Sequence, residues 1–94
     1  MPASLFTAAH RELVTAVKEL RKNARLSQRQ LADALGREQN LVARIETGQR
    51  RVDFIEFIQI CRACGAEPVS ETMKLSRVIA ELTPIKRRYR AKGE

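Results

Sequence analysis

The chain has 94 residues, of which 44% are hydrophobic and 31% charged, which suits one domain with a single core and argues against disorder. Its formal net charge of +7 favours a polyanionic partner, either nucleic acid or an acidic membrane surface. Apolar runs are too short to span a bilayer or to form a signal peptide, and two cysteines do not make a disulfide framework. We therefore expect a cytoplasmic protein without a membrane segment.

The first predicted helix runs from about residue 6 to residue 24. Apolar residues spaced three and four apart share one face of this helix: Phe6, Ala9, Leu13, Val17, Leu20 and Ala24. Charged residues occupy the opposite face, and Ser4 or Thr7 is the expected N-cap. The segment therefore has the pattern of an amphipathic helix that covers a core.

A capping box marks the start of the second predicted helix. In the SQRQ sequence of residues 27–30, the serine hydroxyl and the last glutamine amide can each bond to a free backbone N–H. The helix should bury Leu31, Ala32 and Leu35. It should end at Gly36, which can adopt a left-handed conformation.

A third short helix is predicted over about residues 38–47, with Val42 and Ile45 on its inner face. Glu38 stands at its start, where a carboxylate can cap the helix or interact with its dipole. If the polyanionic partner is nucleic acid, the alternative is that Glu38 accepts a hydrogen bond from a cytosine base. A basic loop at residues 49–51 follows.

A second capping pattern, Asp53 followed by Glu56, begins the fourth predicted helix. Its inner face is expected to hold Phe54, Phe57, Ile58, Cys61 and Cys64, and Gly65 should end it. Ile55 and Ile60 fall outside that stripe, so this helix is apolar on nearly all sides.

The fifth predicted helix begins near Pro68, which suits a first helical turn, and stops at Thr83 before a second proline. Its apolar stripe consists of Leu75, Val78, Ile79 and Leu82.

No segment alternates apolar and polar residues over the length of a strand. We therefore expect a compact all-α domain of five helices at residues 5–83. A basic tail at residues 84–94 is expected to be flexible alone, and it serves either solubility or contact with phosphates.

Enzyme chemistry is a poor match to these residues. The single histidine, His10, has no Cys, Ser or carboxylate arrangement around it, and the four scattered glycines cannot cradle a phosphate. Cys61 and Cys64 form a C-x-x-C pattern that could be a redox switch or half of a zinc site. Without a second ligand pair, core packing is the favoured interpretation. We expect no enzyme activity, no cofactor and no metal.

Two short helices separated by a glycine turn form a helix-turn-helix pattern at about residues 27–47, in which Ala32 allows a close crossing. The wider pattern runs through Leu20-Arg21, Leu26-Ser27-Gln28, Leu31-Ala32, Leu35-Gly36, Val42, Ile45-Glu46, Gly48 and Arg50-Arg51. In these residues the chain resembles the Cro/cI-type family, also called Xre or lambda-repressor-like, of DNA-binding proteins. The resemblance covers roughly residues 13–65. Arg37, Glu38 and Leu41 depart from the family's usual residues.

The resemblance implies that the third helix enters the major groove of DNA. The matching positions make Gln39, Asn40, Ala43 and Arg44 the base-facing residues. Their chemistry agrees, because Gln and Asn amides pair with adenine, Arg pairs with guanine, and a methyl group suits thymine. A solvated surface is the alternative for such a face.

The resemblance also implies contacts with the DNA backbone. The expected phosphate contacts are Gln28, Arg29, Arg37, Thr47, Arg50 and Arg51. The N-terminus of the second helix, where Gln28 lies, favours an anion. Residues that contact phosphate fix the register of a protein on DNA without reading its sequence. Glu46 is interpreted as structural, pairing with a basic residue of the first or second helix.

The few base-facing residues of one third helix read too few base pairs to specify an operator. We therefore expect a two-fold homodimer on palindromic double-stranded DNA. The apolar stripe at Leu75, Val78, Ile79 and Leu82 has little left in the chain to cover it and is the expected interface.

The leading hypothesis is a sequence-specific, nucleoid-associated transcriptional regulator, most simply a repressor. The alternatives are an antitoxin that binds a toxin protein and represses its own operon, and a non-specific or RNA-binding basic protein.

Overall fold

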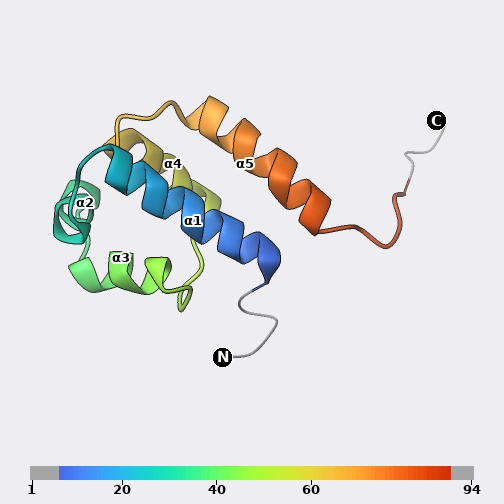
Figure 1. The fold of residues 1–94 in the computed structure, drawn as a ribbon, viewed down its shortest axis with the longest axis horizontal. Helices are drawn as coiled ribbons and strands as arrows, with labels where there is room; N and C mark the ends of the chain where they lie inside the picture. The colour runs from blue at the N-terminus through green and yellow to red at the C-terminus, as the bar shows by residue number, and fades with distance from the viewer. Residues whose placement is uncertain (1–6, 90–94) are drawn as a thin grey trace.

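Helix α1 (Ala8–Asn23) lies at the centre of the molecule, and α3, α4 and α5 pack against it (Figure 1). The computed structural model describes residues 7–89. After α1 the chain forms α2 (Gln28–Leu35), α3 (Gln39–Glu46), α4 (Phe54–Ala63) and α5 (Pro68–Leu82). Since these residues form helices and no strand, the predicted all-α fold with five helices is confirmed.

Helices α3 and α5 lie on opposite sides of α1. In Figure 1, α3 lies below α1, whereas α5 lies above it and runs antiparallel to it. Helix α2 packs against α3 and α4, and α4 also contacts α1 and α5. None of the helices within residues 7–89 is long and apolar enough to cross a membrane.

The predicted caps begin three of the helices. The hydroxyl of Thr7 accepts a hydrogen bond from a backbone N–H of α1. Ser27 and Gln30 form a complete capping box at α2, and Asp53 and Glu56 form another at α4. Each cap satisfies backbone N–H groups that have no partner inside the helix, so the chain itself marks where these helices start.

The turn between α2 and α3 depends on Gly36, which has a φ of 68°. A side chain at that left-handed position would be strained. Glu38 occupies the N-cap position of α3, but its side chain makes no capping hydrogen bond with the described residues, so the predicted side-chain cap is wrong. The acidic side chain is exposed instead.

The core lies where α1, α2, α3 and α4 meet. Its largest fully buried side chains are Leu31, Ile45, Ile60, Val17, Val42 and Cys61. The predicted inner faces of α2 and α3 are therefore confirmed at Leu31, Ala32, Val42 and Ile45. Leu41 is also buried, which the sequence pattern did not indicate. An almost wholly aliphatic core follows from a chain with few aromatic residues.

Two helix faces differ from the prediction. Helix α4 buries Ile60, which was expected outside its stripe, whereas Phe54 is 66% exposed. Phe54 is the first residue of α4 and borders an open groove, so no neighbouring helix covers it. In α1, His10 and Val14 are buried, while Leu13 is only half-buried. Helical periodicity gives the face to within about one residue step, and the neighbouring helices decide the rest.

Helix α5 covers one side of the molecule without burying any of its own residues fully. Pro68 occupies its first turn, as predicted. Residues 84–89 are exposed and lie outside the helices. The predicted helix positions Ser4 and Phe6 and the tail from residue 90 lie outside the described residues.

The two cysteines belong to the packing of α4. Cys61 is fully buried, and burial raises the pKa of its thiol to about 11. Cys64 is half-buried against the same core, and burial raises its pKa also. No group of three or more His, Cys, Asp or Glu side chains within residues 7–89 could hold a metal ion. Packing, rather than thiolate chemistry, accounts for Cys61.

We predict that Cys61→Ala lowers the free energy of unfolding by about 1–2 kcal/mol, because it leaves a small cavity in a fully buried site. Cys64→Ala, at a half-buried position, is the matched control and should cost less. Urea unfolding followed by circular dichroism measures both. Equal losses, or a rapid reaction of Cys61 with a thiol reagent in the folded protein, would contradict the packing interpretation.

Candidate nucleic-acid interface

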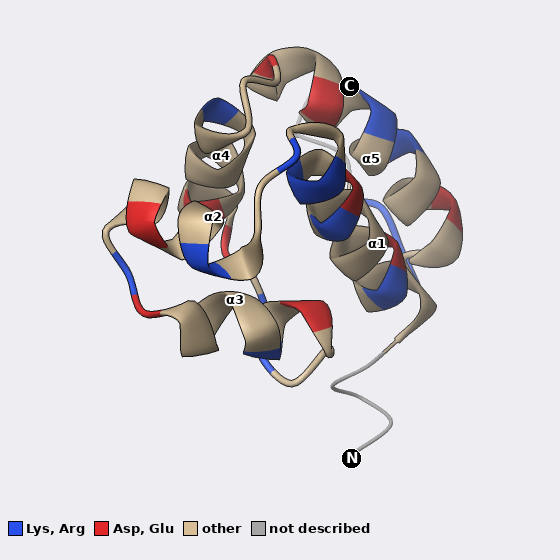
Figure 2. Cartoon of the chain, turned by 60° about the vertical axis from the view of Figure 1, so that its left-hand side comes forward, with Lys and Arg blue, Asp and Glu red and all other residues tan. Residues whose placement is uncertain are grey.

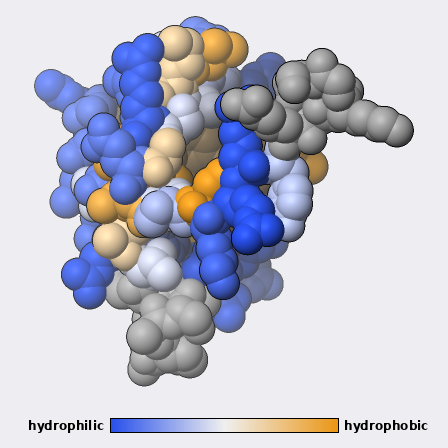
Figure 3. Space-filling model, turned by 90° about the vertical axis from the view of Figure 1, so that its right-hand side faces the viewer, coloured by the Kyte–Doolittle hydropathy of each residue, from blue (hydrophilic) through white to orange (hydrophobic). Residues whose placement is uncertain are grey.

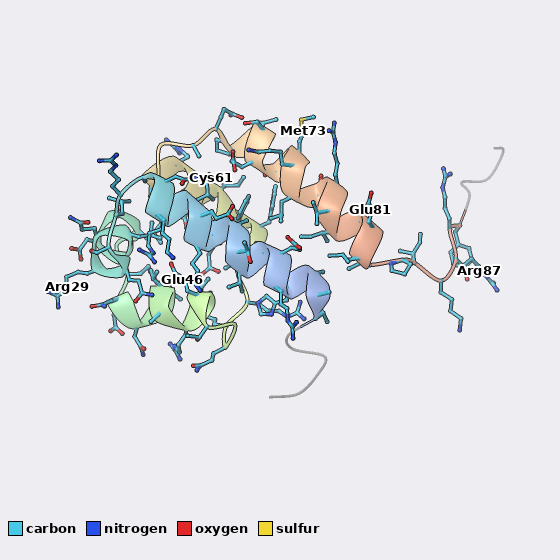
Figure 4. All side chains as sticks on the ribbon, viewed as in Figure 1. Arg29, Glu46, Cys61, Met73, Glu81 and Arg87 are labelled. Atoms are coloured by element: carbon cyan, nitrogen blue, oxygen red, sulfur yellow. The ribbon has the colours of Figure 1, made fainter. Side chains whose placement is uncertain are left out.

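An ion pair between Arg21 of α1 and Glu46 of α3 joins the two helices. The Arg21 Nε donates to Glu46 Oε2 at 2.7 Å, and its Nη2 donates to Oε1 at 3.0 Å. The Glu46 side chain is 2% exposed and that of Arg21 is 13% exposed. Figure 4 shows Glu46 pointing inward from α3. This is the structural pairing expected for Glu46, with Arg21 as the basic partner.

Two further hydrogen bonds extend this pair to the start of the helix-turn-helix. Arg21 Nη1 donates to the carbonyl of Leu26 at 2.8 Å, and Gln28 Nε2 donates to Glu46 Oε1 at 3.1 Å. The ion pair therefore ties α1, the loop before α2, the first residue of α2 and the end of α3 together, with Arg21 bonded to the loop and Glu46 to Gln28. Each bond to a charged group is stronger than a neutral one and satisfies a buried polar atom.

The charge of Glu46 is retained despite its burial. Burial raises the pKa of Glu46, but the hydrogen bonds from Arg21 and Gln28 outweigh it, so the net shift of the pKa is downward. Two N–H groups of the Arg21 guanidinium donate to the two oxygens of Glu46, and this bidentate contact fixes the geometry of the ion pair.

With its inner face and Glu46 fixed, α3 turns a polar face outward. Gln39, Asn40 and Arg44 are exposed, and Ala43 is half-buried. The structure therefore brings the four predicted base-facing residues onto one accessible side of a short helix. Amides, a guanidinium and a methyl group on such a face can pair with base edges in a major groove.

Basic residues lie in the loops at both ends of α3 and on α3 itself (Figure 2). Arg37 is in the turn before α3, and Arg50 and Arg51 are in the loop after it. Arg29 points outward from α2 (Figure 4). The Thr47 hydroxyl donates to the carbonyl of Arg44 at 3.2 Å. The predicted phosphate contacts thus border the α3 face, and their contact with DNA stays a prediction.

Arg50 already has a carboxylate partner in the free protein. Its Nη1 and Nη2 donate to the two oxygens of Glu56 at 2.9 and 2.7 Å, and Nη1 also donates to the carbonyl of Arg51 at 2.9 Å. Arg37 Nη1 lies 3.5 Å from Glu56 Oε2. The hydrogen bond from Arg50 lowers the pKa of Glu56, so this carboxylate is charged at neutral pH.

The sequence pattern predicts only a capping role for Glu56. Its ion pairs require the loop of residues 49–53 to fold back over the first turn of α4, which no spacing in the sequence specifies. A carboxylate at the third position of a helix, preceded by an arginine-rich loop, is the one available signal.

A polar hollow of about 410 Å³ lies beside the N-terminus of α3. Arg37, Arg44 and Arg50 border it, together with Gly36, Glu38 and Leu41. Three guanidinium groups from three successive segments thus border one space on the α3 side of the molecule. Planar guanidinium groups suit phosphate oxygens, so the hollow matches the charge of a DNA backbone.

The four residues of the predicted dimer stripe differ in how far they are buried. Leu75 and Ile79 are half-buried and line an apolar groove of about 450 Å³ with Leu13, Phe54 and Phe57. Val78 and Leu82 are 40% and 42% exposed. Figure 3 shows hydrophobic surface between hydrophilic side chains on the right-hand side of the molecule in Figure 1.

Comparisons with known proteins agree with this geometry. A family model described as a helix-turn-helix domain matches residues 12–73. An Xre-family-like protein from Pseudomonas syringae pv. tomato is 37% identical with a TM-score of 0.70, over 76% of this chain and 87% of that one. The clp gene regulator ClgR from Corynebacterium glutamicum is 21% identical with a TM-score of 0.64, over 77% of this chain and 94% of that one, which is a likeness of fold. No curated protein matches the sequence.

We predict that Glu46→Ala lowers the free energy of unfolding by about 3 kcal/mol, because it leaves the largely buried Arg21 without its anion. The exposed Glu38→Ala is the control and should cost far less. Urea unfolding at pH 7 measures both.

The same pair predicts a pH dependence. Because the pKa of Glu46 is lower in the folded protein, its contribution is present above the ordinary glutamate value of 4.5 and is lost as the pH falls through the folded value. Glu46→Gln should therefore lose less stability than the wild type on acidification below pH 4.5. Identical pH dependences of wild type and variant would show that Glu46 contributes no such stability.

Proposed function

The chain belongs to the Xre family of helix-turn-helix DNA-binding transcriptional regulators, and we propose that it is a sequence-specific repressor that binds palindromic double-stranded DNA as a homodimer. The proposal rests on one observation above all. The outer face of α3 is polar and accessible, while its inner face and Glu46 are buried and fixed. Proteins with this domain are typically not enzymes, and no comparison favours the antitoxin alternative.

Sequence reading is assigned to the outer face of α3. Gln39 and Asn40 suit adenine N6 and N7, and Arg44 suits guanine O6 and N7. Ala43 offers a methyl group to thymine. The rigid mounting of α3 supports this assignment, because base readout requires donors and acceptors that keep their positions.

Backbone contact is assigned to the residues around that face: Gln28, Arg29, Arg37, Thr47, Arg50 and Arg51. Arg29, Arg37, Thr47 and Arg51 are exposed, whereas Gln28 and Arg50 are half-buried. Arg37 precedes α3, and Thr47, Arg50 and Arg51 follow it, and these positions support the role. Gln28 Nε2 donates one N–H to Glu46, so its second N–H and the backbone N–H groups at the start of α2 are the donors assigned to a phosphate. The basic tail from residue 84 adds attraction that does not depend on sequence.

Dimer formation is assigned to the side of the molecule that carries α4 and α5. The apolar groove that Leu75 and Ile79 line, together with the exposed Phe54 and Val78, supports an interface there. A two-fold dimer doubles the number of bases read, and occupation of an operator by such a dimer excludes other proteins from it.

We predict that Arg44→Ala lowers affinity for a selected operator far more than affinity for scrambled duplex. Loss of one bidentate base contact costs about 1–3 kcal/mol and relaxes the preference at one base pair. Arg51→Ala is the control, because loss of a phosphate contact weakens both duplexes alike and lowers the salt slope by about one unit.

Titrations of both duplexes at several salt concentrations measure the two effects. If Arg44→Ala leaves the ratio of the two affinities unchanged, α3 does not read the sequence and the proposed docking is wrong. If Arg51→Ala changes that ratio, the division between reading and attraction is wrong.

We predict that Ile79→Asp converts the dimer into a monomer, because it places a charge in the apolar groove. Arg77→Asp, also on α5 but exposed and outside that groove, should leave the dimer intact. Analytical ultracentrifugation, with circular dichroism to verify folding, distinguishes the variants. A wild type that is monomeric both at micromolar concentration and on DNA would contradict the dimer.

A further inference from the structure

Three arginines border the polar hollow beside α3, but in the free protein part of their positive charge is neutralised by an ion-paired carboxylate. Of its three arginines, Arg37 and Arg50 are both held by Glu56, whose side chain is 13% exposed. Among the described residues, Glu56 forms no ion pair with Arg44, the third arginine of the hollow. One carboxylate at the start of α4 thus pairs with two guanidinium groups on the side of the molecule assigned to DNA and offsets half of their charge.

We infer that Glu56 is a specificity-determining residue that competes with DNA phosphate for Arg37 and Arg50 and so limits sequence-blind binding. The inference rests on the proposed function, since it assigns this side of the molecule to DNA. It goes further in naming an acidic residue that sets the balance between base reading and backbone attraction.

The competition follows from the chemistry of the groups. Carboxylate and phosphate oxygens bind the same paired N–H groups of a guanidinium, and Arg50 gives both of its Nη groups to Glu56. A phosphate must therefore displace this carboxylate or use the N–H groups left over. The negative charge of Glu56 also repels a polyanion at short range.

Helix capping alone does not explain a carboxylate at this position. Glu56 accepts a hydrogen bond from the backbone N–H of Asp53 at 3.1 Å and completes the capping box of α4. A glutamine serves in a capping box equally well, as Gln30 does in α2 of this chain. The charge of Glu56 is what the two arginines require, so Glu56→Gln removes the ion pairs while retaining the cap.

The consequence for specificity differs between the two kinds of DNA complex. In a docked complex the base contacts of α3 fix the orientation, so Arg37 and Arg50 reach only the phosphates that this one orientation places beside them. In sequence-blind binding any orientation is allowed, and released arginines can find phosphates in many of them. Release of these arginines should therefore raise affinity for random duplex more than affinity for an operator.

The test compares Glu56→Gln with Asp53→Asn. Both variants remove one negative charge and both retain a capping side chain. Asp53 accepts a hydrogen bond from the backbone N–H of Glu56 and acts on Arg50 through its charge, whereas Glu56 also accepts hydrogen bonds from that arginine. Binding of each variant and of the wild type to scrambled and selected duplexes is titrated at several salt concentrations. Circular dichroism and urea unfolding verify that both variants are folded.

We expect Glu56→Gln to bind scrambled duplex about fivefold or more tightly at 0.1 M salt, with a salt slope steeper by about one to two units. Its preference for the selected duplex should fall accordingly. Asp53→Asn should change these quantities much less. The gain should disappear when Glu56→Gln is combined with Arg37→Ala and Arg50→Ala, which a purely structural role would not produce.

Two results would overturn the inference. Equal changes in the two variants would indicate a general effect of net charge, and weaker binding by Glu56→Gln would indicate that Glu56 orients the arginines for phosphate. A wild type that binds no selected duplex better than a scrambled one would instead contradict the proposed function. The comparison of the variants on scrambled duplex tests the competition independently of that outcome.

Discussion

The buried ion pair between Arg21 and Glu46 is the interaction on which the arrangement of the helix-turn-helix depends. It joins the last turns of α1 and α3, and through Gln28 it reaches the first residue of α2. A buried charge that loses its partner is strongly destabilising, so each member of this group constrains the others. The same bonds that satisfy the buried charges therefore fix the orientation of α3 relative to α1 and α2.

Helix α3 needs such support because it has only eight residues. A helix of this length is not stable alone in water, and here it is held by Leu41, Val42 and Ile45 in the core and by Glu46 at its end. All four side chains lie on the inner side. The outer positions are consequently free to carry the polar residues to which we assign contact with DNA, and the buried side chains set their geometry.

The sequence predicted the parts of the fold that local chemistry decides. The capping residues Ser27 and Asp53, the left-handed Gly36 and the inner faces of α2 and α3 all depend on a few neighbouring residues. The burial of Ile60 depends instead on how α2 and α3 pack against α4, which periodicity does not contain. The exposure of Phe54 depends likewise on the open groove that it borders with residues of α1 and α5. Glu38 illustrates the same limit, since a carboxylate at an N-cap position can turn to solvent instead.

The candidate site divides in the same way. The polar face of α3 could be predicted because helical spacing places its residues together. The partner of Glu46 could be predicted only as a basic residue of α1 or α2, because the choice of Arg21 depends on how the helices cross. The pairing of Glu56 with Arg37 and Arg50 could not be predicted, because it depends on the path of the loop between α3 and α4.

We propose that α3, held in place by the buried ion pair, reads DNA as part of a two-fold dimer. Selection of binding sites by the wild-type protein from random duplex DNA is the decisive measurement. An inverted repeat should be enriched, with half-sites centred about 10–10.5 base pairs apart, one turn of the double helix. Recovery of sequences with no common motif would contradict it, because a fixed reading helix must prefer some bases over others.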